Sequence, residues 1–280
     1  MPEGDTIHRT ASTLNRALGG RVVQVFESVF PFLNRVDEDQ PLAGRRIEAV
    51  TAAGKHVLMH FSGDLTLRTH MRMSGSWHVY RPGERWWRHR SHLRIRVATD
   101  AFEAVAFDVH DAQFCRTSRL ATESPVGRLG PDLLAEQLDV DAAVARCRAS
   151  GEDTIADLLL DQRALAGIGN VYKCETLFLC GVDPWTPPTA LSDDMLRQLV
   201  ETARTLLRAN VPRASEAGAS PAPTAYRGPR RTTRRDDPEA RLWVYDRAGA
   251  PCRRCGATIA SRKGGPPYAR TTYWCPRCQA

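Results

Sequence analysis

The fold of this chain is decided by the stretch Asp161-Gln-Arg-Ala-Leu-Ala-Gly167-Ile-Gly169-Asn170-Val-Tyr-Lys-Cys-Glu175, which joins two segments with helical apolar spacing. Gly167 and Gly169 permit a tight turn in which backbone N–H groups and the start of the next helix can face a phosphate. Asn170 adds a side-chain donor to this turn. A glycine that only ends a helix would explain the short string equally well, so its meaning depends on the rest of the chain.

Helical periodicity continues on both sides of this stretch. It predicts a helical domain over residues 130–240, in which residues 211–238 are rich in Pro, Gly, Ser, Thr and Arg and form a mobile basic loop. The predicted helices are 135–148, 154–160, 170–180 and 193–210.

The first 125 residues have a different pattern. Residues 5–18 read as one amphipathic helix ended by Gly19-Gly20, and short alternating segments joined by turns such as Ala53-Gly54-Lys55 follow it. This order predicts an α+β protein of two domains whose N-terminal domain, residues 1–125, is a β-sandwich or barrel with flanking helices. The predicted strands are 21–26, 46–52, 56–61, 65–71, 76–80, 92–98 and 104–109.

Four cysteines near the C-terminus are arranged as two short hooks. Cys252-Arg-Arg-Cys255 and Cys275-Pro-Arg-Cys278 have 19 residues between them, a spacing that brings four thiolates to a tetrahedron. Two disulfides are disfavoured in a chain without an export signal, and a catalytic zinc is disfavoured because no coordination position is left for water. The sequence therefore predicts one structural Zn²⁺ in a hairpin module over residues 241–280.

The N-terminal residues Met1-Pro2-Glu3 suggest a nucleophile. After removal of Met1, Pro2 is a secondary amine with a carboxylate beside it, and an α-amine with a pKa of about 8 is partly unprotonated at neutral pH. Such an amine condenses with a sugar aldehyde to a cationic iminium that acidifies the adjacent C–H, which is lyase chemistry. Pro followed by Glu also suits the first turn of a helix, so these residues alone leave both interpretations open.

Charge and composition limit the partners of the chain. The formal net charge is +7, and residues 204–280 carry 15 Arg and one Lys against five acidic residues, which indicates a polyanionic partner. Only Lys55, Lys173 and Lys263 are lysines, so each is a candidate for a specific role. No apolar run of membrane-spanning length and no signal pattern is present, and we expect a soluble cytoplasmic protein without a membrane partner.

The order of these motifs is more informative than any one of them. The Pro-Glu start, a hairpin lysine, the Gly-Ile-Gly-Asn turn and the terminal four-cysteine hairpin resemble the formamidopyrimidine-DNA glycosylase and endonuclease VIII family. The resemblance covers nearly the whole chain and is weakest over 211–238. It implies a β-sandwich domain, a helix-two-turn-helix domain with a zinc finger, and damaged DNA bound in the cleft between them. The implied activity is that of a DNA glycosylase and abasic-site lyase in base-excision repair.

The resemblance also implies roles for individual residues. Pro2 corresponds to the Schiff-base nucleophile, Glu3 to the adjacent acid, and Lys55 to a phosphate contact and proton donor for β-elimination. Asn170 and Arg270 correspond to phosphate clamps, and Arg270 is also implicated in δ-elimination. The further DNA contacts implied are His70, Arg72, Met73, His92, Phe114 and Arg128, of which Arg72, Met73 and Phe114 fall near void-filling positions.

Two departures from the family pattern bear on specificity. Thr6 stands where relatives commonly carry a second glutamate, and Ala112-Gln113-Phe114 replaces an Arg-Arg-Phe wedge. The Pro-Glu-Gly-Asp-Thr-Ile start is similar to the endonuclease VIII branch and predicts oxidised pyrimidines as substrates, although Met73-Ser-Gly75 is similar to the other branch.

Three alternatives remain at this point. They are a preference for 8-oxoguanine or formamidopyrimidines, a non-catalytic zinc-finger DNA-binding protein, and a zinc-ribbon RNA-binding protein. The last explains the cysteines and the basic C-terminal third, but it leaves the N-terminal residues unexplained. For the glycosylase we expect a monomer associated with the nucleoid that needs no redox cofactor and no catalytic metal.

Overall fold

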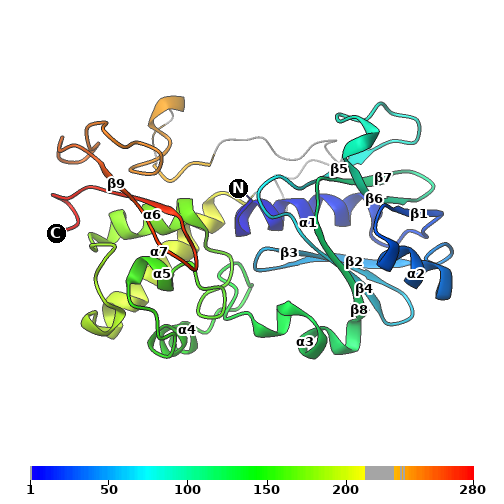
Figure 1. The fold of residues 1–280 in the computed structure, drawn as a ribbon, viewed down its shortest axis with the longest axis horizontal. Coiled ribbons are helices and arrows are strands. Elements are labelled where there is room, and N and C mark those ends of the chain that lie inside the picture. The colour runs from blue at the N-terminus through cyan, green and yellow to red at the C-terminus, as the bar shows by residue number, and fades with distance from the viewer. Residues whose placement is uncertain (1, 212–229, 234, 236) are drawn as a thin grey trace. The chain divides into compact units, whose positions relative to one another are not determined.

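The computed structural model describes residues 2–211, 230–233, 235 and 237–280. They fall into two compact units, one formed by residues 2–128 and the other by residues 129–211 together with the described residues from 230 onward (Figure 1). None of the helices in these ranges is long and apolar enough to cross a bilayer. Most of the predicted loop 211–238 lies outside the described residues.

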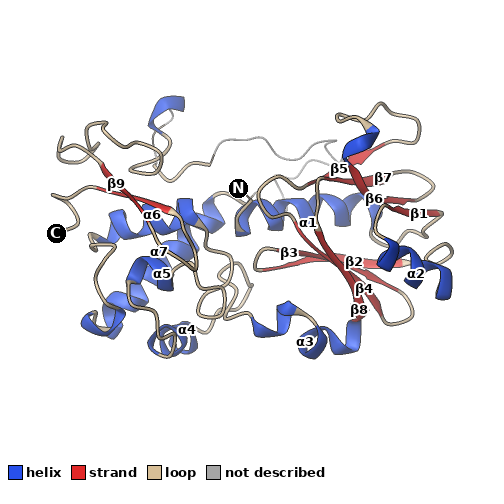
Figure 2. Cartoon of the chain, in the orientation of Figure 1, coloured by secondary structure: helices blue, strands red, loops and turns tan. Residues whose placement is uncertain are grey.

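Two four-stranded antiparallel sheets form the first unit, and their strands are drawn in red in Figure 2. One sheet has the order β1-β6-β7-β5 and consists of β1 (Val25–Ser28), β6 (Leu93–Ala98), β7 (Glu103–Phe107) and β5 (Ser76–Tyr80). The other has the order β2-β3-β4-β8 and consists of β2 (Ile47–Ala53), β3 (His56–Phe61), β4 (Leu65–His70) and β8 (Asp111–Arg116). The N-terminal β-sandwich is therefore confirmed.

Helix α1 (Gly4–Leu18) shares the core of the sandwich. Its buried face includes Ile7, Leu14 and Leu18, which pack in one apolar cluster with residues of both sheets. The helix ends before Gly19-Gly20 as predicted, and Gly20 has a φ of 79° that a residue with a Cβ adopts with difficulty. Helix α1 thereby fixes the position of the N-terminal residues on the first unit.

Three elements of this unit differ from the sequence prediction. The strand expected over 21–26 is β1 at Val25–Ser28, and Val22 makes only an isolated bridge to Arg46. Helix α2 (Pro31–Asp39) was not predicted, because only Leu33 of its nine residues is buried and the apolar periodicity is weak. Strand β8 was not predicted either, since it depends on pairing with β4, not on its own composition. Short helical turns complete the unit: η1 (Arg90–His92), η2 (Thr117–Arg119), α3 (Leu120–Glu123) and η3 (Pro125–Arg128).

The second unit is built around four helices: α4 (Val140–Arg148), α5 (Ile155–Leu158), α6 (Asn170–Cys180) and α7 (Asp193–Ala209). Their apolar faces meet in one cluster that includes Leu158, Tyr172 and Leu199. Helix α6 has the predicted bounds. Helix α4 begins five residues later than predicted, because the Asp139 side chain accepts a hydrogen bond from the Ala142 N–H and caps the helix there. The unit also contains the short turns η4 (Pro188–Ala190) and η5 (Pro238–Ala240).

A cysteine-bearing hairpin completes the second unit. It consists of β9 (Ala260–Lys263) and β10 (Thr271–Trp274), which pair in antiparallel register. Strand β10 begins at Thr271, so Arg270 directly precedes it. A small apolar cluster joins the module to α6 through Cys174 and Phe178.

Candidate active site

The N-terminal residues lie at the start of α1. Glu3 is the N-cap residue and is only 1% exposed, and Pro2 immediately precedes it and is partly buried. The Glu3 side chain makes no capping hydrogen bond to the helix. Pro2 thus directly precedes the N-terminal end of α1, which is the positive end of the helix dipole.

A buried ion pair in the first turns of α1 was missed by the sequence analysis. Asp5 and Arg9 pair at 3.1 Å and are both buried, and the Thr6 hydroxyl donates to Asp5 Oδ1 at 3.3 Å. The four-residue spacing of Asp5 and Arg9 on a helix was the signal that could have found the pair. Thr6, the position that departs from the family pattern, thus lies beside a buried carboxylate.

Lys55 lies in the two-residue turn between β2 and β3. Gly54, the first residue of the turn, has a φ of 56°, which suits a tight hairpin and fixes the direction of the following lysine. The Lys55 charge reaches His70 at the end of β4 and contributes to lowering its pKa. The structure thus brings together Lys55 and His70, two residues predicted for DNA contact.

Beside Lys55, two histidines are held neutral in a polar network. Burial, assisted by the His70 ring, lowers the pKa of His56 to about 3. Burial, assisted by the charge of Arg72, lowers the pKa of His70 to about 4. His70 Nδ1 accepts a hydrogen bond from the Arg72 N–H at 3.1 Å, which requires an unprotonated nitrogen.

Asp111 connects this network to the loop after β4. Its carboxylate accepts from Arg68 at 2.6 Å and from Arg72 at 2.8 Å. Burial opposes ionisation, but the hydrogen bonds and charges of the two arginines hold the pKa of Asp111 below its ordinary value. Neither Arg68 nor Asp111 was predicted, because their pairing depends on the register of β4 with the unpredicted strand β8.

Met73 is displayed by this anchored loop. Its side chain is 59% exposed, and the preceding Arg72 has a φ of 50°, a left-handed conformation that the Asp111 ion pair helps to hold. An apolar side chain on a fixed loop has the form required of a wedge between base steps.

Phe114 does not share this arrangement. It lies within β8, opposite Leu67 of β4, and its ring packs at 5.6 Å from Phe26 and 6.4 Å from Phe61. The partly buried ring therefore packs against the sandwich core, and a void-filling role for Phe114 stays a prediction.

His92 and Arg128 occupy separate positions on the first unit. His92 Nδ1 contacts Asp108 Oδ1 at 3.0 Å, and Arg94 approaches the same carboxylate at 3.9 Å. Arg128 is exposed at the end of η3. Neither residue belongs to the network around His70.

On the second unit, the Gly-Ile-Gly-Asn turn is held by Gln162. Its side-chain amide donates to the carbonyls of Leu160 and Ile168, and its oxygen accepts from the Gly167 N–H. Gly167 has a φ of 103°, a conformation that glycine adopts without strain and that disfavours a residue with a Cβ at this position. Gln162 was not singled out from the sequence, because its hydrogen bonds are to backbone groups that only the folded turn brings together.

Two side chains of α6 hold the start of β10. Asn170 Nδ2 donates to the Thr271 carbonyl at 2.8 Å, and the Lys173 ammonium donates to the Thr272 hydroxyl at 2.8 Å. Lys173 is only 1% exposed. Together these bonds position the residue that precedes Thr271, which is Arg270, so the structure brings the two predicted phosphate clamps together.

A buried carboxylate attaches the rest of the cysteine module to α6. Glu175 accepts hydrogen bonds from the backbone N–H groups of Trp243, Val244 and Tyr245 and from the Thr232 hydroxyl. Burial outweighs these bonds and raises the pKa of Glu175. This role of Glu175 was not predicted, because a lone glutamate in a helix carries no sequence signal for it.

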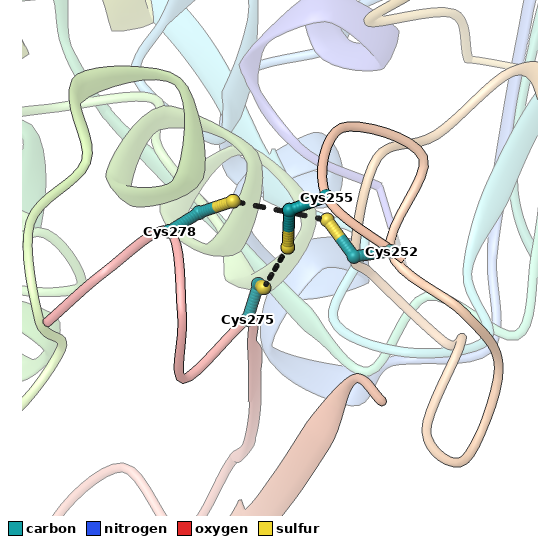
Figure 3. A group of neighbouring side chains, drawn as sticks. All are labelled: Cys252, Cys255, Cys275 and Cys278. Atoms are coloured by element: carbon teal, nitrogen blue, oxygen red, sulfur yellow. Dashed lines mark hydrogen bonds between the residues drawn. The ribbon is translucent and has the colours of Figure 1, made fainter. Parts of the chain in front are cut away.

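The four cysteines form one cluster, shown in Figure 3. Their sulfur atoms all lie within 4.8 Å of one another, with Cys252 and Cys278 at 3.9 Å and Cys255 and Cys275 at 3.5 Å. A tetrahedral metal with metal–sulfur bonds of about 2.3 Å requires sulfur separations of about 3.8 Å. The backbone N–H of Ala257 lowers the pKa of Cys255 to about 7, whereas burial raises the pKa of Cys275 and raises that of Cys278 to about 12. The separations of the four sulfur atoms are therefore the evidence for a metal site. The donor set therefore fits a metal ion.

Comparisons with known proteins agree with this arrangement. Residues 1–115 match the formamidopyrimidine-DNA glycosylase N-terminal domain, and residues 129–220 match the H2TH domain of the same glycosylase. A probable endonuclease 8 2 of Streptomyces coelicolor is 40% identical, covering 100% of this chain and 94% of that protein. Endonuclease 8 2 of Mycobacterium tuberculosis is 38% identical and endonuclease 8 of Escherichia coli 32%, both over 100% of each chain.

Solved structures show the same fold. A formamidopyrimidine-DNA glycosylase of Lactococcus lactis, bound to DNA containing an abasic site, has a TM-score of 0.78 over 99% of both chains at 21% identity. The chain thus belongs to the formamidopyrimidine-DNA glycosylase and endonuclease VIII family. It is a DNA glycosylase and abasic-site lyase of base-excision repair.

Proposed function

We propose that this chain excises oxidised pyrimidines from DNA and cleaves the resulting abasic site through a Schiff base on Pro2. The observation that carries the proposal is the position of Pro2, which stands at the positive end of α1 beside the buried Glu3. The relatives named endonuclease 8 support the same reading.

The reaction follows from the nucleophile. The Pro2 nitrogen attacks C1′, the bond from C1′ to the base breaks, and the base leaves with a proton whose transfer Glu3 assists. The C1′–O4′ bond then breaks, with a proton going to O4′, and the opened sugar is joined to Pro2 as an iminium. The iminium acidifies C2′–H, so loss of that proton expels the 3′ phosphate in β-elimination. A second elimination expels the 5′ phosphate and leaves a gap flanked by phosphates. Lys55 supplies a proton for the first elimination, and Arg270 assists the second.

The DNA contacts proposed are distributed over both units. Lys55 on the first unit and the Asn170–Arg270 pair on the second bind backbone phosphates around an extruded nucleotide. Extrusion costs a few kcal/mol, and Met73 offsets part of this cost by filling the space left in the stack. His70, Arg72, His92 and Arg128 would add phosphate contacts, and the Arg-rich segment 211–238 would add affinity without base selectivity.

The metal in the cysteine cluster is proposed to be Zn²⁺. Cys252, Cys255, Cys275 and Cys278 would hold it, and four thiolates leave no position for a reacting water. Its contribution is folding free energy for residues 241–280, whose apolar cluster is small. No step of the reaction passes through it.

The lesion preference has a second candidate. Relatives named endonuclease 8 match this chain at 32% to 40% identity, whereas the formamidopyrimidine-DNA glycosylase structures match at 20% to 22%. This difference favours oxidised pyrimidines such as thymine glycol or 5-hydroxycytosine over 8-oxoguanine. Single-turnover excision on duplexes that differ only in the lesion tests it. Faster release of 8-oxoguanine opposite cytosine than of any oxidised pyrimidine would overturn the preference.

Borohydride trapping tests the nucleophile itself. The mature protein is expected to begin at Pro2 and to form a covalent adduct with abasic DNA, and a Pro2→Gly variant with one extra N-terminal residue is expected to form none. Intact mass identifies the first residue. Equal trapping by the variant would contradict the role of Pro2, and no trapping by either protein would favour a non-catalytic DNA-binding function.

We further propose that the chain acts as a monomer at the nucleoid. Light scattering after size-exclusion chromatography measures the oligomeric state.

A further inference from the structure

The loop between β5 and β6 carries aromatic and basic side chains that the proposed reaction does not use. Residues 84–90 line an open groove of about 730 Å³. Within residues 81–92 lie two adjacent tryptophans and four arginines: Trp86, Trp87, Arg81, Arg85, Arg88 and Arg90.

Trp86 anchors this loop to the first unit. Its ring packs against a small apolar cluster that contains Tyr80 and Phe107, and its indole N–H donates to Glu103 Oε1 at 2.6 Å. The Tyr80 hydroxyl in turn accepts from the Trp87 N–H at 3.0 Å. The backbone that presents Trp87 is therefore fixed by contacts at two adjacent residues.

Unlike Trp86, which is packed against the apolar cluster, Trp87 is exposed to solvent. It is 51% exposed, and its ring is oriented by stacking with His78 at 5.1 Å and by the Arg88 guanidinium at 4.8 Å from the ring centre. A single exposed aromatic residue is common on protein surfaces and proves nothing alone. A ring with a restrained orientation, however, stacks on another π-system with little loss of conformational freedom.

The charges around Trp87 identify what would stack on it. Arg88 is paired with Asp108, and Arg90 is paired with Glu27. Arg81 and Arg85 are exposed, and neither guanidinium forms an ion pair with any residue that the structure describes. Glu84 lines the same groove, accepts a hydrogen bond from the Arg81 backbone N–H at 2.9 Å and offsets part of this positive charge. An exposed indole next to exposed arginines is the combination that binds single-stranded nucleic acid, with bases on the ring and phosphates on the arginines.

We propose that this loop is a binding site for single-stranded nucleic acid, in which Trp87 stacks on an unpaired base and Arg85 contacts a neighbouring phosphate. The site lies outside the proposed glycosylase and lyase chemistry. It is continuous with a proposed DNA contact, because the loop leads directly to His92 and the side chains of Arg88 and His92 share Asp108. A strand that reaches His92 can therefore extend onto Trp87.

Equilibrium binding of a labelled, undamaged oligothymidylate to the full-length protein tests the proposal by fluorescence anisotropy. Trp87→Leu is expected to weaken binding about tenfold, in the range for loss of one base–aromatic stack. Arg85→Glu is expected to weaken binding and to reduce its dependence on salt, since one phosphate contact is lost. An undamaged strand offers no lesion and no abasic site, so failure of the proposed chemistry leaves this measurement intact.

Matched controls lie on helix α2 of the same unit. Phe32 is 53% exposed and Arg35 is exposed, so Phe32→Leu and Arg35→Glu repeat the two changes outside the groove. Both controls are expected to bind within about twofold of the wild type, because neither residue lines the groove. Wild-type affinity in both groove variants, as expected if the groove binds a protein instead, would overturn the proposal, and so would equal losses in the controls. Arg85→Glu changes an exposed side chain and keeps the test valid if Trp87→Leu fails to fold.

Discussion

Asn170 donates its side-chain amide to the carbonyl of Thr271, a residue 101 positions later in the chain, at 2.8 Å. The Asn170 Oδ1 atom is buried and has no hydrogen-bond partner among the described residues. Asn170 therefore has two proposed roles in phosphate binding. It is a proposed clamp, and it also holds the backbone next to Arg270, the other proposed clamp.

Lys173 is expected to position Arg270 through β10. Lys173→Met removes the hydrogen bond to Thr272, and we expect DNA binding to weaken about tenfold, equivalent to about 1.4 kcal/mol, with little loss of thermal stability because a buried charge is removed at the same time. Thr272→Val removes the other partner of the same bond. A double-mutant cycle measured by binding to abasic-analogue DNA should show coupling between the two sites, and additive losses would contradict the positioning role.

Glu3→Gln is expected to lose base excision far more than cleavage of a preformed abasic site. Release of the base requires proton transfer, whereas an abasic site already presents an aldehyde to Pro2. General acid–base assistance contributes about 10²- to 10⁴-fold, so excision should fall by at least about 100-fold. Single-turnover rates on lesion and abasic duplexes separate the two steps. Equal losses on both substrates would show that Glu3 acts only in folding or in binding.

The cysteine cluster predicts one Zn²⁺ per chain. Chelation of the metal, or Cys252→Ser, is expected to unfold the terminal hairpin and weaken DNA binding by displacing Arg270. Metal content by mass spectrometry and binding before and after chelation check this. Cys147→Ser serves as a control, because Cys147 is a buried thiol in α4 outside the cluster. Full DNA affinity in the metal-free protein would be incompatible with the prediction.

The first unit is expected to lose stability in mild acid. His56 and His70 have folded-state pKa values of about 3 and about 4, below the value of 6.5. The unfolded state therefore binds protons first, so their contribution is complete above pH 6.5 and is lost as the pH falls towards 4. At pH 5 the loss is at most about 2 kcal/mol for each histidine. Urea unfolding at pH 7 and pH 5 measures this loss of unfolding free energy. His56→Gln should reduce the difference in unfolding free energy between the two pH values. An unchanged pH dependence in that variant would show that His56 does not contribute to it.

Parts of this molecule were predictable from local sequence, and others were not. Helix α6 has the predicted bounds because Gly169 and Gly181 delimit it, and the cysteines meet because their spacing is short. Strand β8 and the Arg68–Asp111 ion pair depend on pairing between segments far apart in the chain. Local composition carries no signal of such pairing.

The candidate site shows the same division. Motif order predicts Pro2, Lys55, Asn170 and Arg270 as site residues. It does not predict the supporting contacts of Gln162, Lys173 and Glu175, although Lys173 is a candidate as one of only three lysines. Their roles consist of contacts to backbone and side chains elsewhere, such as the bond from Lys173 to Thr272. A polar residue that becomes buried within a helix is visible only once the helix has a neighbour.

The carboxylate of Glu175 limits how far the cysteine module can be treated as an independent part. Three consecutive N–H groups at residues 243–245 have their acceptor in α6, so a peptide of residues 241–280 would expose them together with one face of its apolar cluster. Grafting the module onto another protein would require the recipient helix to carry a glutamate at the position equivalent to Glu175 and a lysine two residues before it. The smallest transferable piece of this chain is therefore α6 and the module together, exchanged as one.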